Sequence, residues 1–421
     1  MVIVIGVFVI LALGLYGPAT LVGPLPAATA AVTGAGGEAA VTGAPALPET
    51  GATALVSDAS VSVLASAGLT EPVPIGGSAK IITALVVLDA KPLAEGASGE
   101  SIVVTKADYD SFVTYGSQSA RTVPVGQGES WSQREMLQAL LLGSSNNHAD
   151  ALARWAFGSV DAYLEVAATW LTDHGLENTT VVDTTGLDEA DVGTASDLAR
   201  LSALAFAYPA IAEIMTAEDA RLPGNRSVDN LAGYAAEEGF RGLSRSYTDQ
   251  AGICYLFALD VAIGADAAEG TGDDATSGSA GDVVTLYGAF LREPDWETVD
   301  ADLSALAASA SGTLRQTPII SAGQSFVTYT TPWGATARGV ATRTESRMLW
   351  VTSPLEYRVD AKALRTGSKG EQVGSVTVGT PDGDVTVRLE LDQRIGDPGP
   401  FWRLTNPVPV IEAFIDSRTE G

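Results

Sequence analysis

Cysteine and histidine are scarce in this 421-residue chain. The single cysteine, Cys254, excludes an intrachain disulfide, and its apolar neighbours favour a small buried side chain over a reactive thiol. Two histidines, His148 and His174, are too few to form a metal site by themselves, and no glycine-rich phosphate loop is present. We therefore expect neither a metal ion nor an organic cofactor.

Basic residues are also few, because 24 Lys and Arg stand against 51 Asp and Glu, for a formal net charge of −27. This balance excludes nucleic acid as a partner, since there is no basic surface to neutralise phosphates. Hydrophobic residues make up 46% of the chain, which is enough for a sizeable core. The length suits two folded domains and an export segment.

The N-terminus begins with the apolar run MVIVIGVFVILALGLY, and Ala28-Thr29-Ala30 resembles a signal-peptidase site. No Lys or Arg precedes the run. We interpret residues 1–30 as a signal peptide or signal anchor, which predicts an extracytoplasmic protein of the cell envelope, either membrane-anchored or secreted. Residues 31–46 are rich in Ala, Gly and Thr and predict a flexible linker. The following LPETG matches a wall-sorting signal but lacks the apolar stretch and basic tail that such a signal needs.

Periodicity predicts a mixed α/β (α+β) domain over residues 47–293. Two β-like runs near its start suggest an antiparallel pair, and Ser132 with Glu135 forms a capping box for a helix from 133 to about 143. Residues 242–264 predict two strands joined by a turn at Asp249 to Gly252. Further helices are predicted by the runs at 151–159, 161–174, 194–209 and 282–294.

The remaining segments differ in composition. Residues 264–282 are rich in Gly, Ala, Asp and Ser, and match no calcium-loop pattern, so we expect a solvated loop. Residues 294–313 are expected to be a linker. Alternating Thr- and Val-rich runs predict a small β-rich domain over 314–403, and residues 404–421 form a tail with a possible short helix.

Four stretches, PIGGSAKIITALVVLDAKPL, LLLGSSNNHADALA, VVDTTGLDEADVGTASDLARL and YTDQAGICYLFA, carry a family resemblance in their order and spacing. The chain resembles the serine D-alanyl-D-alanine carboxypeptidases, which are low-molecular-weight penicillin-binding proteins with a β-lactamase-like fold. The resemblance covers roughly residues 48–290 and extends to a β-rich C-terminal module. It implies an antiparallel sheet with a helical cluster, and a peptidoglycan stem peptide as substrate.

In this family a serine and a lysine one helical turn later, S-x-x-K, perform acyl transfer, with the lysine accepting the serine proton. Lys80 occupies the lysine position, but Gly77 stands three residues before it and carries no hydroxyl. Ser78 is adjacent. On a regular helix it lies about 200° from Lys80 around the axis, so it serves as a nucleophile only if the backbone at Gly76-Gly77 is distorted.

The second family motif, S-x-N, is present as Ser144-Ser145-Asn146. The resemblance implies that Ser144 relays a proton to the leaving group and that Asn146 holds a backbone amide of the substrate. An ordinary helix-capping turn is the alternative interpretation.

The third motif, K-T-G, is replaced by Ser244-Arg245-Ser246. In relatives its lysine and threonine bind the terminal carboxylate of the substrate, so this contact is weakened here. Strand alternation predicts that Arg245 points opposite to its two neighbours, although its side chain could still bend round to an anion, so carboxylate binding is not excluded. The backbone N–H groups of Gly77 and Tyr247 would form the oxyanion hole by resemblance.

Three hypotheses follow from these motifs. The first is an exported pseudoenzyme that binds peptidoglycan stem peptides or a partner without cleaving them. The second is a working carboxypeptidase that uses Ser78 or, less plausibly, Ser144. The third is a structural partner of cell-wall synthesis proteins, attached to the membrane through its N-terminal segment.

Overall fold

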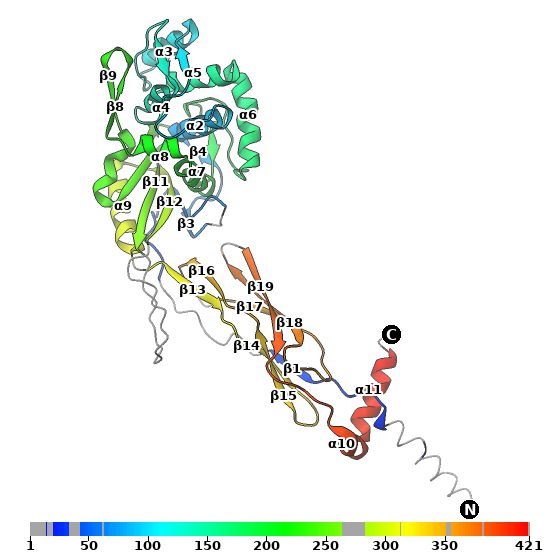
Figure 1. Cartoon of the computed structure of the whole chain (residues 1–421). Coiled ribbons are helices and arrows are strands. Elements are labelled where there is room, and N and C mark those ends of the chain that lie inside the picture. The colour runs from blue at the N-terminus through cyan, green and yellow to red at the C-terminus, as the bar shows by residue number, and fades with distance from the viewer. Residues whose placement is uncertain are drawn as a thin grey trace, which may run out of the picture. The chain divides into compact units, whose positions relative to one another are not determined.

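The computed structural model describes Gly14 and residues 20–32, 43–60, 63–262, 283–311, 313–350, 355–380 and 383–419. These residues belong to two compact units, Thr42–Arg315 and Met1–Val41 with Gln316–Gly421 (Figure 1). The predicted loop at 264–282 lies outside the described residues.

A five-stranded antiparallel sheet forms one part of the first unit, in the order β10-β11-β12-β2-β3. The predicted pair near residue 60 is confirmed as β2 and β3, and β10 and β11 are joined by the predicted turn. The strands of this sheet are β2 (Ala52–Val56), β3 (Ala65–Gly68), β10 (Phe240–Thr248), β11 (Gly252–Ala262) and β12 (Val283–Glu293).

The predicted helix over 282–294 is wrong, because this segment is strand β12. It lies in the middle of the sheet, paired with β11 on one side and β2 on the other. A central strand packed on both faces has apolar residues at consecutive positions, as in Phe290 and Leu291, which are both fully buried. Such a run does not show the two-residue alternation that distinguishes a strand from a buried helix.

The helices of this unit surround α2, whose residues Ala79 to Leu88 are all buried. The predicted capping box at Ser132 and Glu135 is confirmed at the start of α4, and α7 packs against the sheet. The helices are α2 (Ala79–Ala90), α3 (Lys106–Ser117), α4 (Gln133–Leu141), α5 (Asn146–Phe157), α6 (Val160–Asp173), α7 (Ala195–Ala207), α8 (Pro209–Met215) and α9 (Trp296–Ala310). The unit also contains three 3-10 segments, η1 (Gly76–Ser78), η2 (Pro223–Asn225) and η3 (Leu231–Glu238). Its short strands are β4 (Val73–Pro74), β5 (Ser101–Val103), β6 (Ser130–Ser132), β7 (Val192–Gly193), β8 (Asp219–Leu222) and β9 (Arg226–Asp229).

The expected linker at 294–313 is corrected by helix α9. Asp295 caps it by accepting a hydrogen bond from the Thr298 N–H at 2.8 Å. Val299, Leu303 and Leu306 are buried, and their spacing of four and three residues places them on one helical face. The segment therefore packs against β11, β12 and η3 as part of the first unit.

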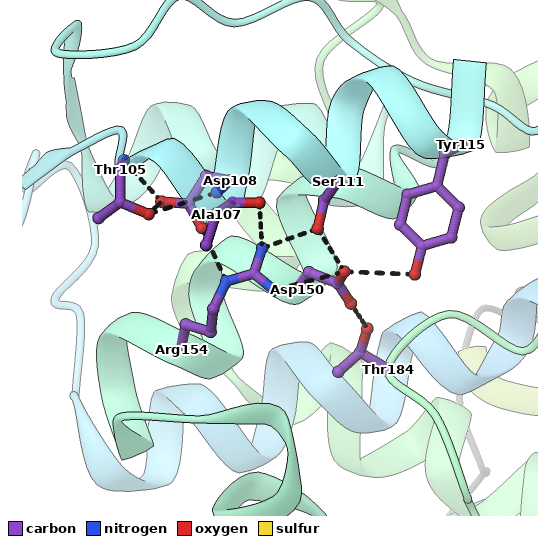
Figure 2. Close-up of polar contacts among 8 residues, drawn as sticks. All are labelled: Thr105, Ala107, Asp108, Ser111, Tyr115, Asp150, Arg154 and Thr184. Carbon is purple, nitrogen blue, oxygen red and sulfur yellow. Dashed lines mark hydrogen bonds and ion pairs between the residues drawn. The ribbon is translucent and has the colours of Figure 1, made fainter. Parts of the chain in front are cut away.

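A buried acid network attaches α3 to α5 (Figure 2). Asp150 accepts hydrogen bonds from Ser111 Oγ at 2.8 Å, from Tyr115 OH at 3.3 Å and from Thr184 Oγ1 at 2.6 Å. Arg154, one turn later on α5, lies 3.6 Å from the same carboxylate. The network thereby connects two helices to the segment that contains Thr184.

The segment 180–193 is a tight loop built on two facing acids. Burial by itself raises the pKa of Asp183, but backbone N–H groups of Thr185, Gly186 and Asp188 donate to its carboxylate and leave that pKa lowered. Burial next to Asp183 raises the pKa of Asp191 to about 8. Gly186 has φ +81, and a Cβ there would lie 1.6 Å from the Gly76 carbonyl oxygen, so only glycine permits this approach.

The second unit is β-rich, as expected for 314–403. Its six-stranded sheet has the order β1-β14-β15-β19-β18-β17, and β13 and β16 form a separate pair. Its strands are β1 (Thr29–Val32), β13 (Arg315–Ile320), β14 (Ser325–Thr330), β15 (Thr336–Ala341), β16 (Glu345–Leu349), β17 (Tyr357–Ala361), β18 (Gln372–Thr380) and β19 (Gly383–Leu391); its helices are α10 (Gly399–Thr405) and α11 (Pro407–Thr419).

The boundary expected between an export segment at 1–30 and a linker at 31–46 is corrected for residues 20–32. Strand β1 crosses that boundary and pairs antiparallel with β14. Leu25 and Ala28 are only 5% and 8% exposed, and Ala28 N–H donates to the Leu364 carbonyl at 2.6 Å. These residues thus contribute an edge strand and buried apolar side chains to the second unit. The apolar run at residues 1–16 lies outside the described residues, apart from Gly14.

Within the described part of the chain, no single helix has the length and apolar character needed to cross a membrane. Helices α7 and α8 meet that requirement only together, with a bend of 94° between them. No three His, Cys, Asp or Glu side chains of the described residues cluster as metal ligands would. Cys254 is buried, and burial raises its pKa to about 12.

The integration of the N-terminal segment predicts a stability effect. We expect Leu25→Ala to lower the unfolding free energy of the second unit by about 2–4 kcal/mol, because it removes a buried leucine. Val22→Ala is the matched control, since Val22 is 83% exposed and should change that energy by less than about 0.5 kcal/mol. Urea unfolding followed by Trp fluorescence measures both. Equal stability of the two variants would contradict the assignment of residues 20–32 to this unit.

The network around Asp150 predicts a second effect. Asp150→Asn replaces one acceptor oxygen with a donor facing other donors, and should lower the unfolding free energy of the first unit by about 2–3 kcal/mol. Asp110→Asn removes an exposed ion pair with Lys106 on the same helix α3, and should cost less than about 1 kcal/mol. Chemical denaturation of both variants is the measurement. The network has no structural role if the two changes are equal.

The facing acids predict a pH dependence. Folding raises the pKa of Asp191 from its ordinary 3.8 to about 8, so the folded state binds a proton that the unfolded state has released within this range. This contribution to stability is complete below pH 3.8 and is lost as the pH rises toward 8, with a slope of up to about 1.4 kcal/mol per pH unit. Asp191→Asn should reduce the slope of unfolding free energy between pH 5 and 8, whereas Asp188→Asn should preserve it. An unchanged slope in Asp191→Asn would refute the assignment.

Candidate active site

Segments η1, α2, β10, α9 and the α4–α5 connection enclose a cleft of about 730 Å³ in the first unit. All the predicted site residues except Ser78 and Ser244 line this cleft. The segment η1 packs against β10 and β11, which brings the start of α2 to the edge strand of the sheet. The lining residues are Gly77, Lys80, Gln118, Ser119, Ala120, Arg121, Ser144, Asn146, Leu187, Arg245, Ser246, Tyr247, Thr248, Asp249 and Trp296.

Lys80 is held at the base of the cleft. Its side chain is buried, and Nζ donates a hydrogen bond to the Thr185 carbonyl oxygen at 2.8 Å. Burial lowers its pKa to about 8, opposed by the charge of Asp183 and aided by that of Arg121. The Lys80 amine therefore releases its proton more readily than an exposed lysine does.

Position 77 faces this lysine as a nucleophile would, but has no room for a side chain. A Cβ built on Gly77 would lie 3.2 Å from Lys80 Nζ and 2.8 Å from Ser246 Cβ. Gly77 does not have a positive φ, so its backbone would accept another residue and the obstacle is the neighbouring side chain. Ser246 Oγ is itself buried without a hydrogen-bond partner among the described residues. Gly77 and Ser246 are the two departures from the family motifs, and they lie against each other. The Ser246 side chain fills the space that a side chain at position 77 would need.

Ser78 lies away from the cleft. The distortion considered from the sequence is present, because Gly76–Ser78 is a 3-10 turn and Gly76 has φ +52. Ser78 is nevertheless 0% exposed, and its hydroxyl is buried without a partner among the described residues. In this conformation its oxygen is not available to a ligand in the cleft.

In the Ser144-Ser145-Asn146 segment, the first and third residues line the cleft and the second does not. Ser144 lines the cleft with an unusual φ of +50, and Asn146, the first residue of α5, has a buried Oδ1 without a partner in the described chain. Ser145 instead lies 2.8 Å from His148 Nδ1 and donates to Asn147 Oδ1. Burial lowers the pKa of His148 to about 3, so this Ser–His pair is a neutral structural contact.

The predicted direction of Arg245 agrees with the strand register. Arg245 pairs with Tyr255, whose ring contacts that of Tyr234, whereas Ser246 pairs with Cys254 and faces Gly77. Arg245 nevertheless lines the same cleft as Ser246. Because β10 is the edge strand, the long side chain extends past the sheet and its guanidinium lies 3.9 Å from the Trp296 ring and 4.6 Å from the Tyr234 ring. Ser244 lines a separate inner hollow of about 10 Å³, at the lower limit for one water molecule.

Arg121 and Trp296 are among the lining residues that sequence reasoning missed. Arg121 follows α3, and burial together with the charge of Arg245 lowers its pKa. Trp296 begins α9, whose apolar spacing was the available signal in a segment interpreted as a linker. No local pattern identified Arg121. Tyr247 is 58% exposed and donates to Asp249 Oδ1 at 3.0 Å.

Residues 40–259, slightly more than half of the chain, match the family described as D-alanyl-D-alanine carboxypeptidase. The D-alanyl-D-alanine endopeptidase of Pseudomonas aeruginosa is 34% identical over 165 residues, which are 39% of this chain and 50% of the relative. The protein of that name from Escherichia coli is 31% identical over 147 residues, 35% of this chain and 44% of the relative. The chain therefore spans about half the length of these curated relatives.

Solved structures show the same fold. A D-alanyl-D-alanine carboxypeptidase from Francisella tularensis matches with a TM-score of 0.61 at 14% identity, over 85% of this chain and 97% of that chain. Penicillin-binding protein 5 from Haemophilus influenzae matches with a TM-score of 0.55 at 14% identity, over 84% and 99%. With the penicillin-binding, β-lactamase-like fold and the family match together, the chain belongs to the D-alanyl-D-alanine carboxypeptidase family of serine peptidases, which acts on peptidoglycan.

Proposed function

We propose that this protein is a catalytically inactive member of its family, exported to the cell envelope, which binds peptidoglycan stem peptides without cleaving them. The observation that carries the proposal is the geometry at position 77. The position that faces Lys80 has no oxygen, and the side chain of Ser246 occupies the volume that a serine there would need.

The chemistry of acyl transfer supports this proposal. A serine peptidase needs a hydroxyl within hydrogen-bond reach of its base, so that the proton leaves as the oxygen attacks the carbonyl. Ser78 has its oxygen buried outside the cleft. Loss of the nucleophile in a serine peptidase reduces turnover by a factor of order 10⁶.

The retained parts of the cleft support binding. Asn146 has a buried amide oxygen without a described partner, which suits a peptide N–H. The curated relatives carry the name D-alanyl-D-alanine endopeptidase, and we extend the D-alanyl peptide from those names to the ligand of this chain. A partner among cell-wall synthesis proteins is compatible with the same cleft, and the apolar N-terminal run would provide the membrane attachment.

The alternative of a working carboxypeptidase has one observation in its favour. Ser144 lines the cleft together with Lys80, whose lowered pKa of about 8 suits a base. An enzyme that used Ser144 or Ser78 would form a covalent acyl-enzyme with a β-lactam, and this difference separates the two functions.

The test is acylation by a fluorescent penicillin, measured by intact mass. We expect no adduct on the unmodified protein, and none on Gly77→Ser, because its new Cβ would lie 2.8 Å from Ser246 Cβ. Gly77→Ser combined with Ser246→Gly restores both the hydroxyl and its space, and should give a detectable adduct at residue 77. The double variant should also be more stable to heat than Gly77→Ser, since overpacking costs about 1–3 kcal/mol.

Ser78→Ala and Ser144→Ala are the controls for the unmodified protein. An adduct on the unmodified protein that disappears in either variant would overturn the proposal and establish an active enzyme. Release of D-alanine from a pentapeptide, measured on the same samples, gives an independent readout of hydrolysis.

A further inference from the structure

Glu293, the last residue of β12, has a buried carboxyl group with few partners. The residue is 0% exposed, and Oε1 has no hydrogen-bond partner among the described residues. Oε2 lies 3.5 Å from Thr50 Oγ1, which is beyond the usual range of a hydrogen bond between two oxygen atoms. An ionised carboxylate is costly in such surroundings, so the neutral acid is the form that this site favours.

The acids nearest to Glu293 increase this cost. Burial, followed by the charges of Asp302 on α9 and Asp295 at its start, raises the pKa of Glu293 to about 7, while the contact with Thr50 acts in the opposite direction. Both acids are like charges to an ionised Glu293. The neutral form is therefore favoured by the arrangement of α9 as well as by burial.

The other charged and titratable groups on the packed elements do not supply a buried counter-charge. Glu49, just before β2, adds its negative charge to the surroundings of Asp302. On β11, the buried Cys254 thiol faces the carboxyl, and burial raises the pKa of this thiol to about 12, so it is neutral. Arg292 precedes Glu293 on β12, but it is exposed and its charge acts on Cys254.

The backbone next to Glu293 is strained. Arg292 has φ +61, a left-handed value that residues other than glycine seldom adopt, and the pairing of β11 with β12 shifts its register between Ile253 and Tyr255. Such conformations persist only where the surrounding structure holds them. Because Glu293 is the partner of Ile253 at this irregularity, the packing of its side chain contributes to holding both strands there.

Two parts of the cleft wall are connected to this point. Trp296 follows Glu293 by three residues, begins α9, and has its ring 3.9 Å from the Arg245 guanidinium. On the other strand, Ile253 follows the β10–β11 turn, in which Asp249 lines the cleft. A local loosening at Glu293 would therefore act on both of these wall segments.

We propose that Glu293 is a proton-controlled latch of the cleft wall. The neutral carboxyl holds the junction of β12 and α9 in the closed form seen in the structure, and loss of its proton favours a local opening that moves Trp296 away from Arg245. The proposal does not depend on whether the cleft binds or cleaves a peptide, because it concerns the wall and not the ligand.

Linkage gives the direction and size of the effect. In the open form the carboxyl is solvated and has its ordinary pKa of 4.5, against about 7 in the closed form. The closed form is therefore fully stabilised below pH 4.5, and this stabilisation is lost as the pH rises to 7. The opening constant should increase by up to about 10-fold per pH unit across this range and level off above pH 7.

Hydrogen exchange of the backbone amides at 249–254 and 294–300 measures the opening in the full chain, after correction for the intrinsic pH dependence of exchange. Acrylamide quenching gives a second readout. The fluorescence of Trp296, obtained as the difference between the unmodified protein and Trp296→Phe, should be quenched more strongly at pH 7 than at pH 5.

Variants assign the effect to the carboxyl. Glu293→Gln keeps the size of the neutral acid and cannot ionise, so its opening constant should not change with pH. Glu297→Gln is the matched control, because it removes an exposed acid from the first turn of α9 and should keep the pH dependence. Asp302→Asn removes a like charge, so levelling should occur at a lower pH. Asp191→Asn removes the other buried acid with a raised pKa and should leave this local opening unchanged.

The latch is overturned if the unmodified protein shows the same opening constant from pH 4.5 to 7, or if the pH dependence persists in Glu293→Gln. Exchange that follows the expected curve without any change in the quenching of Trp296 would overturn the connection to the cleft wall. If Glu293→Gln fails to fold, the levelling point in Asp302→Asn decides, and an unchanged value there refutes the proposal.

Discussion

The buried ammonium group of Lys80 is the contact on which the site depends. A lysine in the interior is tolerated only where oxygen atoms accept its hydrogen bonds, and here the Thr185 carbonyl oxygen does so. That carbonyl belongs to a loop shaped by Asp183 and Asp191. The same loop is tied to the helices through Thr184 and Asp150. Central helix, loop and helical cluster therefore share one polar framework beneath the cleft.

Above this framework, Gly77 lies against the side chain of Ser246. Gly77 and Ser246 are complementary, because the volume absent from one is occupied by the other. Taken separately, Gly77 and Ser246 are two unrelated differences from the family motifs. Packed together, they avoid the clash that a side chain at position 77 would make with Ser246 Cβ. Position 77 therefore has no hydroxyl, while the polar framework beneath it is intact.

The position of β10 at the edge of the sheet allows Arg245 to line the cleft. Because no further strand covers this edge, the Arg245 side chain extends beyond the sheet to reach Trp296 of α9. Arg121 approaches from the segment after α3, so the positive wall is assembled from three distant parts of the chain. The cleft is therefore lined by more cations than acids, although the chain as a whole has a formal net charge of −27.

Family, motif order and most elements of the first unit were determined by the sequence, because short-range spacing specifies them: the capping box at Ser132 and Glu135 starts α4 as predicted. The sequence also located Gly77 and Ser246 but gave no reason to connect them. Only the tertiary structure placed them in contact, packed Arg245 against Trp296, made β12 a strand and added residues 29–32 to the second unit. These outcomes depend on contacts between residues far apart in the chain, and local periodicity carries no information about which distant surfaces will meet.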